Sequence, residues 1–378
     1  MSLIEDLERR GWTRWPTFAE DPFFEELVTL RSWLTSEFTR MVNDAHMNAS
    51  TATGQYGFTA DGDEGEGDVR EIRSHLVWNQ TLPDGHPLSE SMPLFYGAHH
   101  LSGIMSGFAQ KCERLAELLD LFTLEYFEKL EAELGLEFGK IAGNIAMGER
   151  LLRFQWYPPI SDGEVEEFML PVHGKVIPVA GIRKDNGQVQ VRVSPHRDTG
   201  HWTWQVGATD AQLRFWDDHT EQPASPPVGN FILGNVGDFL ELELPGFRSP
   251  VHWVDMDENS RNTPRVSISY FVHARPSVST LGRPAGARLY DRLLELGYAA
   301  HDERQSAIEL LDRGDWTDAE LVRRTLHWEE DNGFTAPGFA SGLSRYFEQA
   351  VMGSLPSRRR RESVPPLRDF FSGETRST

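Results

Sequence analysis

The sequence has almost no cysteine and no long apolar run. Cys112 is the single cysteine among 378 residues, which excludes an internal disulfide framework and a thiolate metal cage. We expect Cys112 to be a small buried hydrophobic residue in a helix. No apolar run reaches membrane-spanning length, and the first thirty residues show no signal peptide. These absences favour a protein of the reducing cytoplasm.

Basic residues are also few. There are 37 Lys and Arg residues against 58 Asp and Glu residues, giving a net charge of −21. A chain this acidic is repelled by nucleic acid and by anionic membranes, so we expect neither as a partner. The one basic run, residues 358–361, lies in a Ser- and Pro-containing stretch (354–378) that we predict to be a flexible tail.

The first 150 residues are predicted to be a helical lead-in that packs on a β-rich core. A short helix is expected within residues 1–19, followed by a loop through Trp15-Pro16. Asp21-Pro22 is typical of a helix start, and helical spacing then continues to Met41. Residues 47–68 are polar and rich in glycine, which predicts a loop. A strand is expected at His75–Trp78, and a long helix at 104–134.

From residue 151 to about 280 the pattern changes to many short strands. Asn186-Gly187 lies between two alternating runs and predicts a hairpin. Leu240, Leu242 and Leu244 alternate with glutamates, which predicts a half-buried strand. The other predicted strands lie at 153–157, 203–206, 213–216, 230–235 and 265–272. This content favours an α+β fold with a mainly β core, built as an antiparallel sandwich, barrel or jelly roll.

Helices are predicted again in residues 281–353. Residues 287–296 and 306–311 have helical patterns, and Thr317-Asp-Ala-Glu320 has the spacing of a capping box that opens a third helix. There are no internal repeats, and the whole chain is expected to form one structural unit.

His196 and Asp198 are the first candidate metal ligands. Residues two apart on a strand point to the same face, so both side chains can enter one cavity while Arg197 points away. His252 follows 54 residues after Asp198. Two imidazoles and one carboxylate are the ligand set of a non-haem Fe(II) site with open coordination positions. The alternative is chance, because the chain has 13 histidines; a pairing of His196 with His201 is disfavoured.

Arg265 and Ser267 are candidate anion-binding residues. They are two apart on a predicted strand and share one face. A buried guanidinium needs an anion, and it binds a carboxylate through two parallel hydrogen bonds to which a hydroxyl can add a third. A dicarboxylate that chelates iron at one end would reach this pair with the other. The alternative is an internal ion pair of Arg265 with Asp238 or Asp255.

Five motifs in order resemble the 2-oxoglutarate/Fe(II)-dependent dioxygenases, in particular the isopenicillin N synthase-like branch. Arg153-Phe-Gln-Trp-Tyr-Pro-Pro159 is similar to the branch's Arg-x-Asn-Tyr-Tyr-Pro-Pro. His196-Arg-Asp-Thr-Gly-His-Trp-Thr203 is similar to His-Thr-Asp-x-Gly-x-x-Thr. The remaining three are Gly234–Phe239, His252-Trp-Val254, and Arg265-Val-Ser-Ile-Ser-Tyr-Phe271, the last similar to Arg-x-Ser-Ile-x-x-Phe.

The resemblance implies a double-stranded β-helix, or jelly roll, over residues 151–280, flanked by N- and C-terminal helices. It implies iron ligation by His196, Asp198 and His252, with 2-oxoglutarate and O2 as co-substrates. It places Arg265, Ser267 and Tyr157 on the distal carboxylate of 2-oxoglutarate. Gln155 stands where the branch has an asparagine near the metal-bound end.

Three functions remain open at this point. The first is an oxygenase that hydroxylates, desaturates or cyclises a small molecule in specialised metabolism, such as antibiotic or natural-product biosynthesis, releasing succinate and CO2. The second is an Fe(II) oxidase that does not use 2-oxoglutarate and holds the substrate's carboxylate with the Arg/Ser pair. The third is a non-catalytic binding module. We expect a monomer or simple homo-oligomer.

Substrate contacts are the least determined part of the site. Candidates are Tyr56, Arg73, Trp204 and Phe271. Trp204 belongs to an aromatic set (Trp202, Trp204, Phe215, Trp216) that could line a pocket, with core packing as the alternative. Residues 160–192 exceed the usual length for the branch, so they are expected to form a lid or substrate wall. The C-terminal helices could cover the barrel mouth or mediate self-association.

Overall fold

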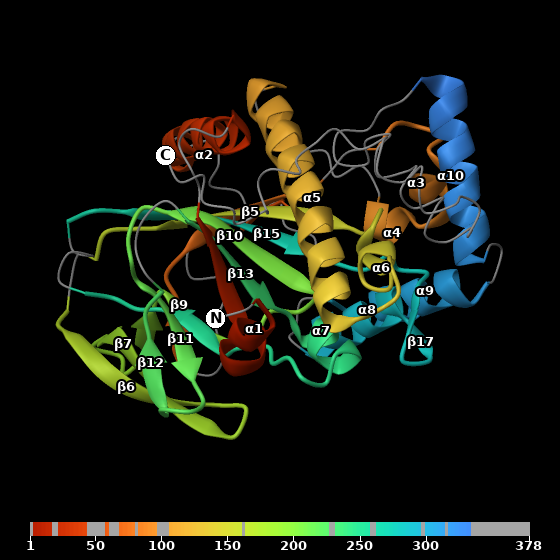
Figure 1. Cartoon of the computed structure of the whole chain (residues 1–378). Coiled ribbons are helices and arrows are strands. Elements are labelled where there is room, and N and C mark those ends of the chain that lie inside the picture. Colours follow the sequence, from red (N-terminus) through yellow and green to blue (C-terminus); the bar gives the residue numbers. More distant parts are fainter. Residues whose placement is uncertain are drawn as a thin grey trace, which may run out of the picture.

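The computed structural model describes residues 3–16, 22–43, 57–59, 68–79, 82–96, 106–160, 163–226, 231–257, 262–295, 299–313 and 317–333. Figure 1 shows most of the helices above the sheets or to the right of them. The helices are α1 (Leu3–Arg10), α2 (Pro22–Val42), α3 (Pro87–Ser91), α4 (Pro93–Tyr96), α5 (Ser106–Leu134), α6 (Ala142–Ile145), α7 (Asp238–Glu243), α8 (Ala285–Glu295), α9 (His301–Asp312) and α10 (Asp318–Asn332).

The main sheet has seven strands, and strands from both halves of the chain form it. Its order is β1-β13-β10-β15-β5-β4-β2. The strands are β1 (Trp12–Pro16), β13 (Phe231–Val236), β10 (Trp202–Ala208), β15 (Arg265–Val272), β5 (Arg150–Tyr157), β4 (Ser74–Asn79) and β2 (Gly57–Thr59). Every neighbouring pair is antiparallel. The predicted α+β class with a mainly antiparallel core is therefore confirmed.

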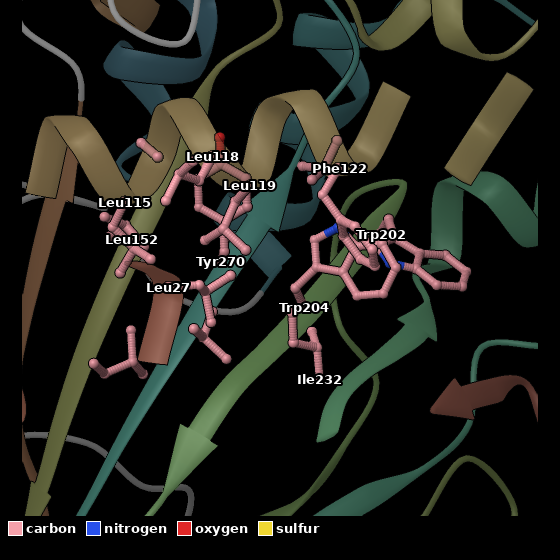
Figure 2. Close-up of a cluster of buried hydrophobic side chains, with 14 of the residues drawn as sticks. Leu27, Leu115, Leu118, Leu119, Phe122, Leu152, Trp202, Trp204, Ile232 and Tyr270 are labelled. Atoms are coloured by element: carbon pink, nitrogen blue, oxygen red, sulfur yellow. The ribbon is translucent and has the colours of Figure 1, made fainter. Parts of the chain in front are cut away.

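Helices α2 and α5 cover one face of the main sheet. Residues of alternate positions on β5, β10 and β15 point to this face and pack with Leu115, Leu119 and Phe122 of α5 (Figure 2). Cys112 lies in the same cluster and is fully buried, as predicted. The intervening residues of these strands, which include Gln155, therefore point to the opposite face of the main sheet, its inner side.

A second sheet of four strands faces the inner side of the main sheet. Its order is β12-β11-β14-β9, with β12 (Gln222–Ala224), β11 (Leu213–Asp217), β14 (His252–Val254) and β9 (Val193–His196). Tyr157 of the main sheet packs with Val193 and Val254 of the second. The rings of Trp12 and Phe215 also stack across the two sheets, with centroids 5.1 Å apart. The space between the two sheets contains the polar side chains discussed below.

A third sheet packs on the outer side of the second sheet. Its order is β3-β8-β7-β6, with β3 (Val69–Glu71), β8 (Val189–Val191), β7 (Lys175–Arg183) and β6 (Val165–Val172). Phe168 and Ile177 of this sheet pack with Trp253, whose side chain points away from that of its neighbour His252. Residues 160–192 were expected to form a lid or wall. Their described part forms strands β6, β7 and β8 of this sheet, whose apolar residues pack on Trp253. The role as a lid or wall stays a prediction.

The C-terminal helices form a separate hydrophobic cluster with α3 and α4, at the right of Figure 1. Arg275 connects them to the core. Its guanidinium donates to the carbonyl oxygens of Gly143 and Ala146 and forms an ion pair with Asp318 at 2.7 Å. The capping prediction at Thr317 is confirmed, since its Oγ1 accepts from the Glu320 amide at 3.3 Å.

Three local predictions were wrong. Residues 57–59, within the loop predicted at 47–68, form strand β2, which pairs with β4. Residues 12–16 form strand β1 rather than a loop, because the open edge of β13 pairs with them from Trp12 to Pro16. Residues 238–243 form helix α7 rather than a strand. Leu240 and Leu244 lie one helical turn apart, so an apolar/polar alternation this short fits both structures. Gly237 precedes the helix in an extended conformation as its N-cap.

The other predicted elements are confirmed where they can be compared. Strand β4, helix α5 and the hairpin at Gly187, between β7 and β8, lie where expected. Most of 47–68 and all of 354–378 lie outside the described residues. The division into lead-in, core and C-terminal extension stays a prediction, although β1 and β4 of the lead-in belong to the main sheet. Among the described helices, none has the length and apolarity needed to cross a membrane.

Candidate functional site

His196, Asp198 and His252 meet at one end of the second sheet. Strand β9 ends at His196 and pairs with β14 so that His196 lies opposite His252. One potential ligand atom from each of the three residues lies within 4.8 Å of the others. Asp198 Oδ1 lies 3.6 Å from His196 Nε2 and 3.5 Å from His252 Nε2. The structure therefore brings together all three predicted ligands.

The remaining polar atoms of the three ligands already have partners. The Nδ1 atoms of His196 and His252 lie 2.9 Å and 3.1 Å from the carbonyl oxygens of Ser194 and Pro250. A carbonyl only accepts, so each Nδ1 carries a hydrogen, and Nε2 is the ring nitrogen of each histidine that lies toward the cluster. Asp198 Oδ2 accepts from Asn235 Nδ2 at 2.8 Å. This pattern of outer hydrogen bonds orients ligands in metal sites, so the donor set fits one divalent ion.

Electrostatics support the same arrangement. Burial by itself would raise the pKa of Asp198, but the two imidazoles outweigh it and hold that pKa well below the usual value. Burial would lower the pKa of His252, yet the Asp198 carboxylate raises it. Asp198 and His252 are almost fully buried, whereas the His196 side chain is 42% exposed. The centre is thus open to solvent on the His196 side.

Helix α7 holds the loop that follows Asp198. The amides of Gly237, Asp238 and Phe239 donate to the carbonyl oxygens of His201, Asp198 and Gly200 at 3.0, 2.9 and 2.9 Å. A methyl group on Gly237 would lie 2.4 Å from the Gly200 oxygen, so only glycine permits this close approach. The Gly234–Phe239 motif therefore holds the loop that follows Asp198 in place through backbone hydrogen bonds.

The other candidate histidines near the motif are not ligands. His201 is buried and its Nε2 lies 2.9 Å from Glu243 Oε1. His219 is exposed in a turn. Arg197 points away from the cluster, as predicted, and lies 3.2 Å from Glu241 and 3.9 Å from Asp238.

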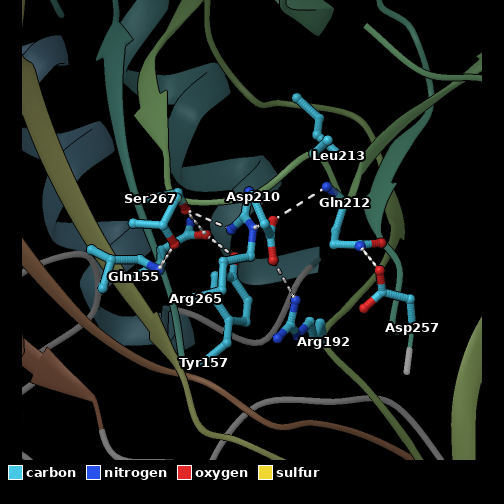
Figure 3. Close-up of polar contacts among 12 residues, drawn as sticks. Gln155, Tyr157, Arg192, Asp210, Gln212, Leu213, Asp257, Arg265 and Ser267 are labelled. Atoms are coloured by element: carbon cyan, nitrogen blue, oxygen red, sulfur yellow. Dashed lines mark hydrogen bonds and ion pairs between the residues drawn. The ribbon is translucent and has the colours of Figure 1, made fainter. Parts of the chain in front are cut away.

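A second polar cluster lies on the inner face of the main sheet. In the register of β15 with β5, Arg265 is opposite Tyr157 and Ser267 is opposite Gln155. The Arg265 guanidinium lies over the Tyr157 ring at 4.7 Å and donates to Ser267 Oγ at 2.9 Å. Tyr157 donates to Gln155 Oε1. Figure 3 shows these four side chains together, as the sequence predicted. Their roles toward a ligand stay predictions.

Arg265 also has an internal carboxylate partner, which is neither Asp238 nor Asp255. Its Nε donates to Oδ1 of Asp210 at 2.7 Å. Asp238 instead neighbours Arg197, and Asp255 pairs with Arg214 at 3.1 Å. Asp210 lies in the short connection after β10, in a sequence with no motif.

Arg192 completes this cluster and was missed by the sequence analysis. Its side chain is fully buried, and Nη1 donates to Oδ2 of Asp210 at 2.9 Å. Arg192 lies four residues before His196, at the bend between β8 and β9. Only burial distinguishes it from the surface arginines, and no periodic pattern predicted that burial.

The predicted substrate contacts are divided between different faces. Phe271 is on the inner face and packs with the Arg153 guanidinium at 5.1 Å. Trp204 lies on the other face, where its ring is in the helix-facing core and Nε1 donates to Thr123 Oγ1 at 2.8 Å. Trp202 and Trp216 are also in core clusters, so core packing describes these three tryptophans. Phe215 packs beside His252 at 5.5 Å. Arg73 forms a buried pair with Glu71 at 2.8 Å; Tyr56 lies outside the described residues.

Comparison with known proteins gives structural neighbours but no sequence relatives. No protein-family model and no curated protein matches the chain. A 2OG-Fe(II) oxygenase family protein from Caulobacter crescentus superposes with a TM-score of 0.58 at 19% identity, over 78% of this chain and 92% of that one. The chain has the fold of the 2-oxoglutarate/Fe(II) oxygenases. At this identity the likeness concerns the fold.

Two further neighbours share this fold. A protein from Shewanella oneidensis described as an oxygenase gives a TM-score of 0.55 at 20% identity, over 78% of this chain and 94% of that one. A full-length protein from Neurospora crassa, solved in complex with alpha-KG and thymine, gives 0.51 at 16% identity, over 86% of this chain and 89% of that one. The shared fold spans most of each neighbour.

Proposed function

We propose that the protein is a non-haem Fe(II)- and 2-oxoglutarate-dependent oxygenase that oxidises a small molecule. The observation that carries the proposal is the arrangement of His196, Asp198 and His252, each with one ligand atom directed at the cluster and its other polar atom hydrogen-bonded. When bound, ferrous iron would supply the redox chemistry that couples oxidative decarboxylation of 2-oxoglutarate by O2, giving succinate and CO2, to oxidation of the substrate.

The chain's own residues would bind and orient the reactants. His196, Asp198 and His252 would hold the metal and leave positions open for the 2-oxo acid and O2. Arg265 and Ser267 would anchor the distal carboxylate, with the Tyr157 ring against the guanidinium. Gln155 accepts from Tyr157 and so fixes the orientation of that phenol. The main and second sheets would form the two sides of a double-stranded β-helix that keeps these groups in place.

The substrate class belongs to the same proposal. The Neurospora crassa protein that shares the fold was solved with thymine, which is a small molecule, beside alpha-KG. A small molecule is therefore the reactant we propose here, in specialised metabolism, with Phe271 and Arg73 as contacts. A cytoplasmic location is supported by the single cysteine.

A second candidate is an Fe(II) oxidase that does not use 2-oxoglutarate. The Arg265 Nε is already paired with Asp210, so part of the anion site is neutralised internally. In that case Arg265 and Ser267 would hold the carboxylate of the substrate itself.

A titration separates the two functions. Protein loaded anaerobically with Fe(II) is titrated with 2-oxoglutarate while the visible spectrum is recorded. The proposed oxygenase gives a saturable metal-to-ligand charge-transfer band with one 2-oxoglutarate per iron. Stoichiometric iron binding without that band favours the oxidase, and absence of iron binding favours a non-catalytic module. A His196→Ala, Asp198→Ala double variant should lose the iron and the band, whereas Arg248→Met, an exposed arginine, should keep both.

A further inference from the structure

Arg192 and Arg265 converge on the same carboxylate. Asp210 Oδ2 accepts from Arg192 Nη1 at 2.9 Å, and its Oδ1 accepts from Arg265 Nε at 2.7 Å (Figure 3). The Tyr157 ring lies 5.7 Å from the Arg192 guanidinium and 4.7 Å from that of Arg265. Two guanidiniums therefore share one anion and one aromatic ring.

The formal charge of this group is not balanced. Two guanidiniums and one carboxylate leave one positive charge in a cluster where both arginines are buried. Asp210 is 30% exposed at its side chain, so it reaches the arginines from the solvent side. A buried excess charge is costly unless a counter-ion joins it. One further carboxylate would neutralise the cluster.

Arg192 also has hydrogen-bond donors without acceptors. The Arg192 side chain is fully buried, so water does not reach its Nε and Nη2 atoms. Neither atom makes a hydrogen bond to any described residue. Burial lowers the pKa of Arg192, and the positive charge of Arg265 lowers it further. The Asp210 carboxylate opposes this shift in part. Two adjacent unused N–H groups on one guanidinium match the two oxygens of a carboxylate.

We propose that Arg192 is a second arginine of the co-substrate anion site and that it selects 2-oxo acids with a distal carboxylate. This inference rests on the proposed function. Arg265 and Ser267 would hold one side of the carboxylate, and Arg192 would donate from Nε or Nη2 on the other. Asp210 keeps the two guanidiniums together and leaves the cluster with one positive charge, which one monoanionic group would balance.

The test compares two 2-oxo acids that chelate iron in the same way. Wild-type protein and Arg192→Met are loaded anaerobically with Fe(II) and titrated with 2-oxoglutarate and with 2-oxobutanoate, which lacks the distal carboxylate. The dissociation constants are read from the charge-transfer band. We expect Arg192→Met to weaken 2-oxoglutarate binding by on the order of 10- to 100-fold, the loss typical of a charged hydrogen bond, and to change 2-oxobutanoate binding less than about twofold.

The outcomes distinguish the inference from the function beneath it. Equal weakening of both acids, or no weakening of either, overturns the role of Arg192 while leaving the oxygenase in place. No band with wild-type protein and 2-oxoglutarate overturns the proposed function and the inference with it. If Arg192→Met does not fold, Arg192→Lys retains the charge but not the planar fork. It should show a smaller loss that is still selective for 2-oxoglutarate, and an unselective loss again overturns the inference. Arg248→Met is the surface control.

Discussion

Asn235 donates from Nδ2 to Oδ2 of Asp198 at 2.8 Å, and this leaves Oδ1 as the carboxylate oxygen nearest both imidazoles. The hydrogen bond crosses between β13 and the loop after β9. It fixes which Asp198 oxygen faces His196 and His252, because the oxygen that accepts from the amide is held toward Asn235. Asn235 of the main sheet therefore orients the carboxylate of a candidate metal ligand.

Removing that hydrogen bond should weaken metal binding. We expect Asn235→Ala to lower Fe(II) affinity by roughly 10- to 100-fold, the usual effect of losing a partner of a metal ligand. Competition with a metal-sensitive chelator under anaerobic conditions measures the change. Asn332→Ala, an exposed residue of α10, is the matched control. Unchanged affinity in Asn235→Ala would show that Asp198 is positioned by its backbone alone.

Adding one methyl group at Gly237 should disturb the close contact between α7 and the loop that follows Asp198. Gly237→Ala would place Cβ 2.4 Å from the Gly200 oxygen, so the loop after Asp198 must shift. We expect a loss of about 1–3 kcal/mol in unfolding free energy together with reduced Fe(II) affinity. Denaturant unfolding and the metal competition assay measure the two effects. Gly107→Ala is the control, because its Cβ meets no atom within 4 Å. Wild-type metal affinity in Gly237→Ala contradicts the role given to α7.

Glu149 should make the protein less stable as pH rises. Burial raises the pKa of this carboxyl to about 8, with Arg150 opposing the shift, and neither carboxylate oxygen has a hydrogen-bond partner among the described residues. The unfolded chain loses this proton near pH 4.5, whereas the folded protein keeps it to about pH 8. The unfolded state binds fewer protons in that window, so stability falls between these pH values.

Glu149→Gln should remove this pH dependence. We expect the variant to match the wild type near pH 4.5 and to exceed its unfolding free energy by about 4 kcal/mol at pH 8. Urea unfolding across that range gives both curves. The exposed Glu330→Gln should follow the wild type. Parallel curves for Glu149→Gln and wild type would mean that the carboxylate ionises in the folded protein.

Trp204 should matter for stability and not for the site. Its ring is fully buried beside Phe122 and Trp202, and Trp204→Phe also removes the hydrogen bond to Thr123. We expect a loss of about 1–3 kcal/mol in unfolding free energy with unchanged Fe(II) and 2-oxoglutarate affinities. Trp33→Phe, on the partly buried side of α2, should cost less. Altered 2-oxoglutarate affinity at wild-type stability would return Trp204 to the candidate site residues.

The sequence by itself determined the candidate metal ligands and much of the strand content. His196, Asp198 and His252 belong to short motifs whose residue types carry the chemistry, and the alternation of residues 265–272 fixed which face Arg265 and Ser267 share. Local signals also predicted α5 and the cap at Thr317. These features depend on neighbours within a few positions, so they can be recognised in one chain.

Only the tertiary structure decided the remainder. The pairing of β1 with β13 and the helical state of residues 238–243 depend on partners far away in the chain, which a short alternation cannot reveal. The same holds for Arg192 and Asp210. Their 18-residue separation carries no pattern, and they meet Arg265 only because the second sheet folds over the first. Because Arg192 and Arg265 are buried, little water solvates their charges, so both depend on the Asp210 carboxylate as a counter-ion.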